Sequence, residues 1–208
     1  MPNPARIAAD TESLRGLAIA SGGKIALLGV PAPGTPRFVV ELGYATAGSA
    51  AYPARRQERT RIVIDLPARY PFEPPRATVT TPILHPNVFL SGLVCLGAKW
   101  LPSEGMDLFV QRLARLVTFD PLLVNVHSAA NREALAWYLA ARARHPEAFP
   151  TDRVDVGGPA QGPARVQWRE ADRAVVACPG CGGKLRLPAG RRGTVRCPKC
   201  ANEFEAAT

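Results

Sequence analysis

Residues 70–100, which read YPFEPPRATVTTPILHPNVFLSGLVCLGAKW, decide the fold of this chain. Proline fixes φ and forces the residue before it into extended geometry, so neither YPFEPP nor HPN can lie inside a helix. The β-branched run between these two motifs is typical of a strand. Ser91 and Gly92 provide a turn before an apolar stretch that contains Cys95. We therefore expect Cys95 on an irregular, proline-stiffened segment laid over a sheet edge.

The spacing of these motifs is specific. HPN begins ten residues after Pro75, Cys95 follows Asn87 by eight residues, and Trp100 comes shortly afterwards. In this respect the chain resembles the ubiquitin-conjugating enzyme family. The resemblance covers roughly residues 5–144, and residues 70–100 carry it. It implies an α+β fold, in which an antiparallel β-meander is flanked by helices.

The resemblance also implies an activity. In the family, one cysteine accepts a ubiquitin-like protein as a thioester from an activating enzyme and passes it to an amine, in some cases with the help of a ligase. Cys95 matches that nucleophile. Thiol exchange needs only the few per cent of thiolate that an unperturbed cysteine has near neutral pH. The alternative is that Cys95 is a small core residue between Val94 and Leu96.

Asn87 and His85 are the other candidate catalytic residues. A preorganised amide donor stabilises the oxyanion that forms when an amine attacks a thioester, and removing such a donor typically costs about 10²–10³ in rate. The resemblance assigns this role to Asn87, either as the direct donor or by holding the neighbouring loop. The alternative is an asparagine that only caps a turn. For His85 the resemblance implies a buried residue bonded to backbone and not a general base.

The resemblance is weaker at the positions that would act on the acceptor amine. Family members carry an acidic residue in the loop after the Asp-Pro pair, whereas this chain has Asn125 near that position. An amide can orient an amine but cannot deprotonate it. We therefore expect lysine transfer to be slow, or to depend on Asp120, His127 or an added partner. The interval from Cys95 to Trp100 is also shorter than in typical members.

The rest of residues 1–144 supplies the predicted helices and strands. Periodicity predicts an amphipathic helix over 5–20, with Leu14 and Leu17 on the apolar face and Asp10 largely away from it. Two later helices are expected, one capped by Asp107 and one rich in alanine. The predicted strands span 24–30, 37–46 and 61–66, and the two later helices span 107–118, with Leu108, Leu113 and Leu116 inward, and 128–144, with Leu135, Tyr138 and Leu139 on one face.

The last part of the chain divides into a linker and a second small domain. Residues 145–173 have no periodicity and are rich in proline and glycine, so we interpret them as a linker. Residues 174–208 contain two C-x-x-C pairs, and such pairs supply the four thiolates of a tetrahedral Zn²⁺ site better than they supply a redox pair. We predict a structural zinc ribbon held by Cys178, Cys181, Cys197 and Cys200, for which metal binding contributes on the order of 10 kcal/mol or more to folding. Ala201 stands where small ribbons often have glycine.

The composition limits the classes of protein to which the chain can belong. The 208 residues are 47% hydrophobic and 21% charged, as in globular proteins. No apolar run approaches the roughly 20 residues needed to cross a bilayer, so we expect a cytoplasmic protein without a membrane partner.

The net charge of +9 raises the expectation of an acidic partner but does not identify it. Two functions from other classes therefore stay open. One is a non-catalytic adaptor with the same fold. The other is a ribbon that binds protein or nucleic acid, although no aromatic row is present to stack bases.

Overall fold

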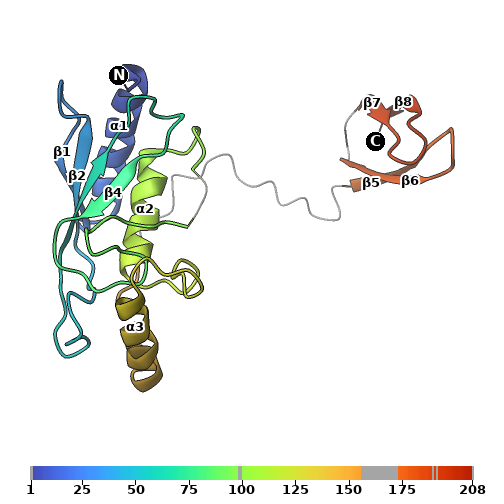
Figure 1. Ribbon diagram of the computed structural model, residues 1–208. Coiled ribbons are helices and arrows are strands. Elements are labelled where there is room, and N and C mark those ends of the chain that lie inside the picture. Colours follow the sequence, from blue (N-terminus) through green and yellow to red (C-terminus); the bar gives the residue numbers. More distant parts are fainter. Residues whose placement is uncertain (1, 98–99, 156–172, 189, 191, 208) are drawn as a thin grey trace. The chain divides into compact units, whose positions relative to one another are not determined.

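The computed structural model describes residues 2–97, 100–155, 173–188, 190 and 192–207. The chain divides into two compact units, residues 1–158 and residues 159–208 (Figure 1). Each unit is described by itself. The part of the predicted linker that spans 156–172 lies outside the described residues.

The first unit is built on a four-stranded antiparallel meander with strand order β1-β2-β3-β4. Along these strands, buried residues alternate with more exposed ones, which is the pattern of a sheet with one covered face. The strands are β1 (Ile25–Gly29), β2 (Arg37–Leu42), β3 (Thr60–Asp65) and β4 (Arg76–Val79). The predicted antiparallel meander is therefore confirmed.

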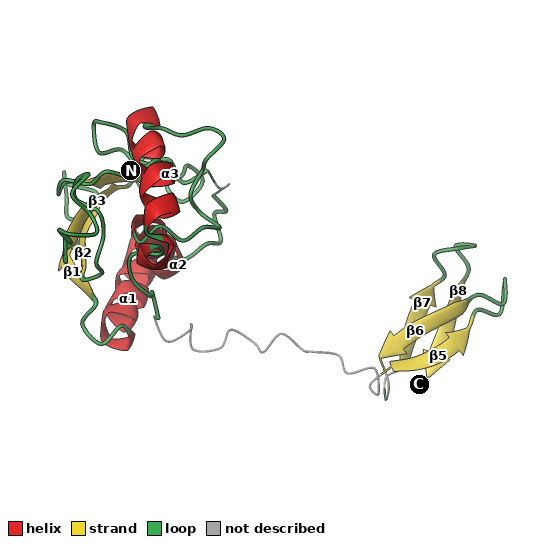
Figure 2. Ribbon diagram, turned by 90° about the horizontal axis from the view of Figure 1, so that it is seen from below, coloured by secondary structure: helices red, strands yellow, loops and turns green. Residues whose placement is uncertain are grey.

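Three helices lie to one side of this sheet (Figure 2). They are α1 (Pro4–Ala20), α2 (Met106–Val117) and α3 (Arg132–Arg144). Helix α1 begins where the Asn3 side chain accepts the backbone N–H of Arg6 at 3.2 Å. Helix α2 is the most buried of the three, with a full apolar stripe against the sheet. The α+β class predicted from the sequence is confirmed.

Several helix details differ from the sequence prediction. Helix α2 begins at Met106, one residue earlier than predicted. Its N-cap is Gly105, and Asp107 lies in its first turn without capping it. Helix α3 begins at 132 and not at 128, because Asn131 caps it by accepting the backbone N–H of Ala134 at 2.9 Å. Leu108 is exposed, although it was expected to face inward, and Leu139 is exposed while Tyr138 of the same predicted face is buried. Asp10 is buried in the stripe of Leu14 and Leu17, contrary to the prediction.

Helix α2 ends in an unusual way. The N–H of Phe119 bonds the carbonyl of Leu116 at 2.9 Å, and the N–H of Asp120 bonds that of Arg115 at 3.0 Å. This pair of bonds is a Schellman motif, which normally has glycine at the left-handed position. Here that position is Phe119, with φ of 61°. Its fully buried ring stacks on Tyr138 with a centroid distance of 5.3 Å.

The first unit extends past the boundary at 144 that the sequence predicted. A 3₁₀ turn, η1 (Pro146–Ala148), follows α3, and the chain then packs back onto the unit. Thr151 donates its hydroxyl to the carbonyl of Ala45 at 2.6 Å, and Asp152 accepts the N–H of Ala45 at 2.9 Å. Side-chain and backbone hydrogen bonds to distant residues hold residues 146–154 in place. Such bonds do not require a hydrophobic periodicity in the sequence. The sequence pattern therefore does not separate them from a linker.

The second unit contains two antiparallel hairpins. They pair β5 (Arg173–Ala177) with β6 (Lys184–Pro188), and β7 (Arg192–Arg196) with β8 (Glu203–Ala207).

Each hairpin of the second unit carries one cysteine turn. In one turn the N–H of Gly182 bonds the carbonyl of Cys178 at 2.8 Å, and in the other the N–H of Ala201 bonds that of Cys197 at 2.9 Å.

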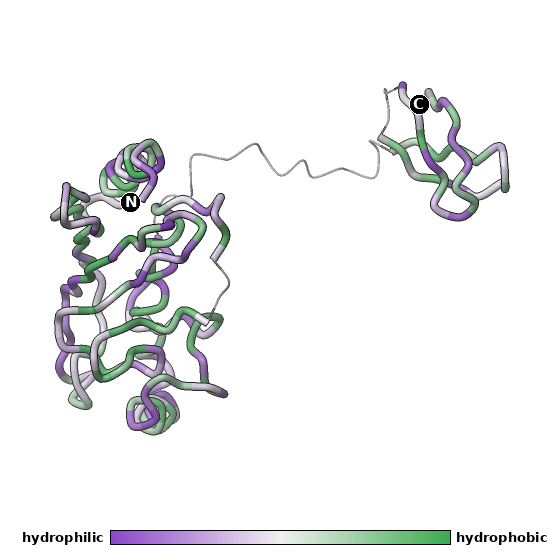
Figure 3. Tube along the Cα trace, turned by 45° about the horizontal axis from the view of Figure 1, so that its top comes forward, coloured by the Kyte–Doolittle hydropathy of each residue, from purple (hydrophilic) through white to green (hydrophobic). Residues whose placement is uncertain are grey.

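Hydrophobic and hydrophilic residues follow one another at short intervals along the described chain (Figure 3). Within the described residues, no helix combines the length and the apolar character that a membrane crossing requires.

The two cysteine turns differ at one position, which allows a test. Gly182 has φ of 68° and Ala201 has φ of 57°, so both occupy the left-handed region. A Cβ costs roughly 1–2 kcal/mol there. We therefore expect Ala201→Gly to stabilise the second unit by about 0.5–1 kcal/mol, since the strain relieved exceeds the added chain entropy. The measurement is hydrogen exchange of residues 178–200 in the full chain at fixed zinc.

The control is Gly182→Ala, where the added Cβ would meet no atom within 4 Å. Gly182→Ala should speed hydrogen exchange of residues 178–200 by about the factor by which Ala201→Gly slows it. Faster exchange in Ala201→Gly would contradict the interpretation.

Candidate functional site

The segment that carries Cys95 runs along the free edge of β4. The N–H of Val79 bonds the carbonyl of Gly92 at 2.8 Å, and the N–H of Val94 bonds that of Ala77 at 2.9 Å. Cys95 follows directly and is partly exposed, with a free thiol. The structure thus has Cys95 on an irregular segment at a sheet edge, where solvent reaches it. A fully buried core cysteine does not describe this residue.

Gly92 allows the close approach between this segment and β4. Its φ is +84°, and a Cβ built on it would lie 2.3 Å from the carbonyl oxygen of Val79. Real Cβ atoms do not approach a carbonyl so closely, so no other residue fits without a shift of the backbone. Sequence reasoning placed a turn at Ser91-Gly92 but missed this contact, because the contact depends on a strand that is distant along the chain.

The Asn87 carboxamide joins three segments. Its Nδ2 donates to the carbonyl of Cys95 at 3.0 Å and to the carbonyl of Leu123 at 3.1 Å. Its Oδ1 accepts the N–H of Asn125 at 3.0 Å. In addition, the N–H of Cys95 bonds the Asn87 carbonyl at 2.7 Å. Asn87 is buried, so its side chain positions the cysteine segment against the 120–125 loop.

His85 is fully buried beneath this arrangement. Its Nδ1 accepts the N–H of Asn87 at 3.0 Å, which assigns the proton of the neutral ring to Nε2. Its ring lies 4.3 Å from that of Phe119. Burial lowers the pKa of His85 to about 3, although the Leu116 backbone opposes the shift. The imidazole is therefore neutral, and its acceptor nitrogen is already bonded to backbone.

The loop beyond α2 holds the residues considered for deprotonating an acceptor. The Asn125 side chain accepts the N–H of His127 at 3.2 Å and that of Ser128 at 2.8 Å, so it closes a turn. Asp120 is paired with Arg115 through contacts of 2.7 and 2.6 Å. Of these residues, the exposed His127 side chain is the one without such a contact among the described residues.

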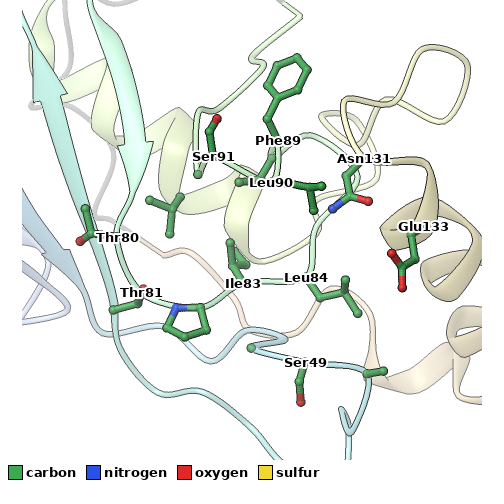
Figure 4. Close-up of a pocket in the computed structure, with 16 residues that line it drawn as sticks. Ser49, Thr80, Thr81, Ile83, Leu84, Phe89, Leu90, Ser91, Asn131 and Glu133 are labelled. Atoms are coloured by element: carbon green, nitrogen blue, oxygen red, sulfur yellow. The ribbon is translucent and has the colours of Figure 1, made fainter.

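A groove of about 650 Å³ is lined in part by residues 79–84 and 88–92, which precede Cys95 in the chain. Figure 4 shows Ile83 and Leu84 between Thr80 and Thr81 on one side and Leu90 and Asn131 on the other. Leu90 is 92% exposed. Phe72 is also exposed.

The four cysteines of the second unit form the candidate metal centre. Their Sγ atoms all lie within 4.8 Å of one another. Cys178 and Cys200 have a sulfur separation of 3.7 Å, as do Cys181 and Cys197. Four ligands at the Zn–S distance of about 2.3 Å would be separated by about 3.8 Å in a regular tetrahedron. The donor set and spacing therefore fit Zn²⁺.

The local backbone favours a thiolate at one of these ligands. The N–H groups of Cys200 and Lys199 lower the pKa of Cys197 to about 6. Cys178 and Cys197 are buried, whereas Cys181 and Cys200 are exposed.

Comparison with known proteins identifies related chains. The family model "Ubiquitin-conjugating enzyme" matches residues 56–149. The chain is 31% identical to ubiquitin-conjugating enzyme E2 T of Bos taurus over 131 residues, which cover 53% of this chain and 67% of that protein. It is 32% identical to the Mus musculus protein of the same name, over 50% of this chain and 56% of that protein.

Among solved structures, S. cerevisiae Ubc12 is similar, with a TM-score of 0.51 and 22% sequence identity. The similarity covers 69% of this chain and 75% of that chain. This comparison supports the fold of the first unit.

Gly92 provides a test of how the cysteine segment is held. We expect Gly92→Ala to lower the free energy of unfolding of the first unit by about 2–4 kcal/mol, because the new methyl overlaps the Val79 carbonyl. Chemical denaturation followed by tryptophan fluorescence measures this loss. Gly97→Ala is the matched control, since φ there is +65° but no atom lies within 4 Å. Equal losses in the two variants would show that the contact is unimportant.

His85 predicts a pH dependence. Its pKa in the folded state, about 3, lies below the ordinary value of 6.5, so the unfolded chain binds a proton that the native chain excludes. This contribution to stability is complete above pH 6.5 and is lost as pH falls, by up to about 1.4 kcal/mol per pH unit. We expect His85→Gln and His85→Asn to have a shallower slope of stability against pH between 6 and 4.

The control for this slope is His145→Gln, at an exposed histidine. Urea unfolding at several pH values, followed through Trp100 and Trp137, reports on the first unit. A slope in the two His85 variants equal to that of the unmodified chain would disprove the prediction.

Proposed function

The chain belongs to the ubiquitin-conjugating enzyme family, and from this premise we propose that it is a cysteine-dependent transferase. It accepts a ubiquitin-like protein from an activating enzyme as a thioester on Cys95 and passes it to an amine acceptor. A ligase or a protein substrate would be the further partner. The observation that carries the proposal is the partly exposed Cys95 thiol, held on both its N–H and its carbonyl by Asn87.

The first step is an exchange between two thiols. The Cys95 thiolate attacks the carbonyl carbon of the incoming thioester, and the sulfur of the activating enzyme leaves as a thiolate. Both sulfurs have similar leaving ability, so the step requires accessibility and orientation more than a base. Cys95 is partly exposed and its backbone N–H and carbonyl are both bonded, which supports this role.

Asn87 contributes by positioning. Each of its two amide hydrogens is directed at a backbone carbonyl, of Cys95 and of Leu123. A role as direct oxyanion donor requires one of these bonds to break, whereas holding the loop requires no change. Of the two roles considered, positioning has the support of the geometry. His85 helps to position Asn87 by accepting the backbone N–H of Asn87, and it performs no proton transfer in this proposal.

The second step needs a proton to leave the acceptor. An ammonium group cannot attack a thioester until it is deprotonated, and the side chains near the 120–128 loop do little to help. Asn125 is used in a turn and Asp120 is paired with Arg115. We propose that deprotonation comes from solvent, His127 or a partner, so that aminolysis is slower than thiol exchange.

The second unit is proposed to hold one structural Zn²⁺ through Cys178, Cys181, Cys197 and Cys200. When bound, the ion neutralises the thiolates and supplies the free energy that the small apolar core lacks. The exposed strands of the two hairpins are then available to recruit a partner or substrate. This recruitment is distinct from the chemistry at Cys95.

The proposed activity has a direct test. The full chain is mixed with ATP, an activating enzyme and candidate ubiquitin-like proteins, and intact masses are recorded before and after reduction. We expect one adduct with the mass of the ubiquitin-like protein minus water, which thiol reductant removes. Cys95→Ala should abolish it, whereas Cys95→Ser should form an ester that resists reductant.

The zinc cysteines provide the control for thiol specificity. An adduct that persists in Cys95→Ala would lie on another cysteine and would refute the assignment of Cys95. The complete lack of an adduct with partners that charge another family member would favour the non-catalytic adaptor.

A further inference from the structure

The N-terminus of α2 is capped from another helix. Gly105 occupies the N-cap position and has no side chain to satisfy the first N–H groups. Asp10 of α1 supplies this function, because its Oδ1 accepts the N–H of Met106 at 3.1 Å. A carboxylate at this end of a helix also interacts favourably with the helix dipole.

The same carboxylate is the centre of a buried network. Asp10 is 2% exposed. Its Oδ2 accepts Arg6 Nε at 2.9 Å and also accepts the hydroxyl of Tyr70. A buried charge without partners would cost several kcal/mol, so the positions of these partners are closely coupled. Asp10 therefore links α1, the start of α2 and the YPFEPP segment.

Arg6 extends this network to the loop that follows Cys95. Its guanidinium donates to the carbonyl of Pro102 at 2.5 Å and to the carbonyl of Glu104. Glu104 in turn accepts Arg112 of α2. The loop of residues 101–105 is thus held by its backbone carbonyls from one side and by an ion pair from the other.

Trp100 completes the anchor. Its Nε1 donates to the carbonyl of Pro71 at 2.7 Å, and its ring lies 6.0 Å from that of Tyr70. The five residues from Cys95 to Trp100 can span at most about 17 Å. The position of Trp100 therefore limits how far Cys95 can lie from this network.

We infer that Arg6 and Asp10 are positioning residues for acyl transfer at Cys95. They fix the chain after the cysteine, at residues 102–106, whereas Asn87 holds Cys95 itself through its N–H and its carbonyl. This inference rests on the proposed function, since it assigns Cys95 an acyl group to transfer. It adds that α1, which makes no described contact with Cys95, determines the geometry of that transfer.

The test uses Arg6→Lys in the zinc-loaded full chain. Lysine keeps the positive charge beside Asp10 but lacks the planar fork with which Arg6 directs separate nitrogens at the carboxylate and the two carbonyls. Asp10→Asn is the second variant and weakens the cap of α2. The controls are Glu12→Gln and Arg15→Gln, which break an exposed pair on the same helix with no contact to the loop.

A small aryl thioester replaces the unidentified protein partners. The Cys95 thiolate attacks its carbonyl carbon and the arylthiolate leaves. A primary amine then attacks the same carbon, the Cys95 sulfur leaves as a thiolate, and the ammonium proton passes to the buffer. Intact mass follows both steps, peptide mapping localises the acyl group, and Cys95→Ala is the blank.

We expect Arg6→Lys and Asp10→Asn to lower the rate constant of aminolysis at saturating amine about tenfold, with the half-saturating amine concentration unchanged. Hydrogen exchange of residues 100–106 should become faster in both. The two control variants should match the unmodified chain. A general loss of folding would instead affect exchange throughout the first unit.

Two other outcomes are distinguishable. If Cys95 is acylated and the two variants react within twofold of the unmodified chain, the inference is overturned while the proposed function stands. If the unmodified chain acquires no acyl group that Cys95→Ala lacks, the proposed function fails and this inference fails with it.

Discussion

The buried carboxamide of Asn87 is the interaction on which the arrangement of the first unit's site depends. It brings together the HPN segment, the cysteine segment and the loop after α2, which are separated by up to 38 positions in the chain. Its two donors and its acceptor are all matched. Removing the carboxamide would leave two carbonyls and one N–H, all partly buried, without these partners, each at a cost of up to about 1–3 kcal/mol. This completeness is why the side chain can specify a single geometry.

A second polar network performs a similar task at the other end of the cysteine segment. Asp10 is buried and its partner Arg6 is partly buried, and such an ion pair rarely adds net stability because the ions lose hydration. Their contacts instead determine where the 101–105 loop and the start of α2 lie. Cys95 is consequently held between a neutral amide network and an ionic one, with the sheet edge beneath it.

The spacing of the motifs predicted the α+β fold and the meander through the family resemblance that it carries. The irregular segment around Cys95 was predictable from the residues themselves, because prolines and β-branched residues restrict the backbone locally. The cysteine spacing likewise predicted four thiols that lie together. Contacts between distant residues were not predictable in this way. Asp10 is polar and was expected outside, yet its partners Tyr70 and Met106 bury it. Residues 146–154 resembled a linker because they are held by the bonds from Thr151 and Asp152 to Ala45, and such bonds leave no periodic pattern in the sequence.

The end of α2 has a consequence for how this protein can diverge. Phe119 adopts a backbone conformation suited to glycine while its ring packs against His85, Tyr138 and Phe149. Glycine would suit the backbone but would vacate the aromatic cluster, and a bulky aliphatic side chain would fill the space but keep the strain. Few single exchanges at this codon are therefore neutral. A substitution at position 119 would need compensating substitutions among its neighbours. Phe119 and the buried His85 are therefore expected to change together in evolution.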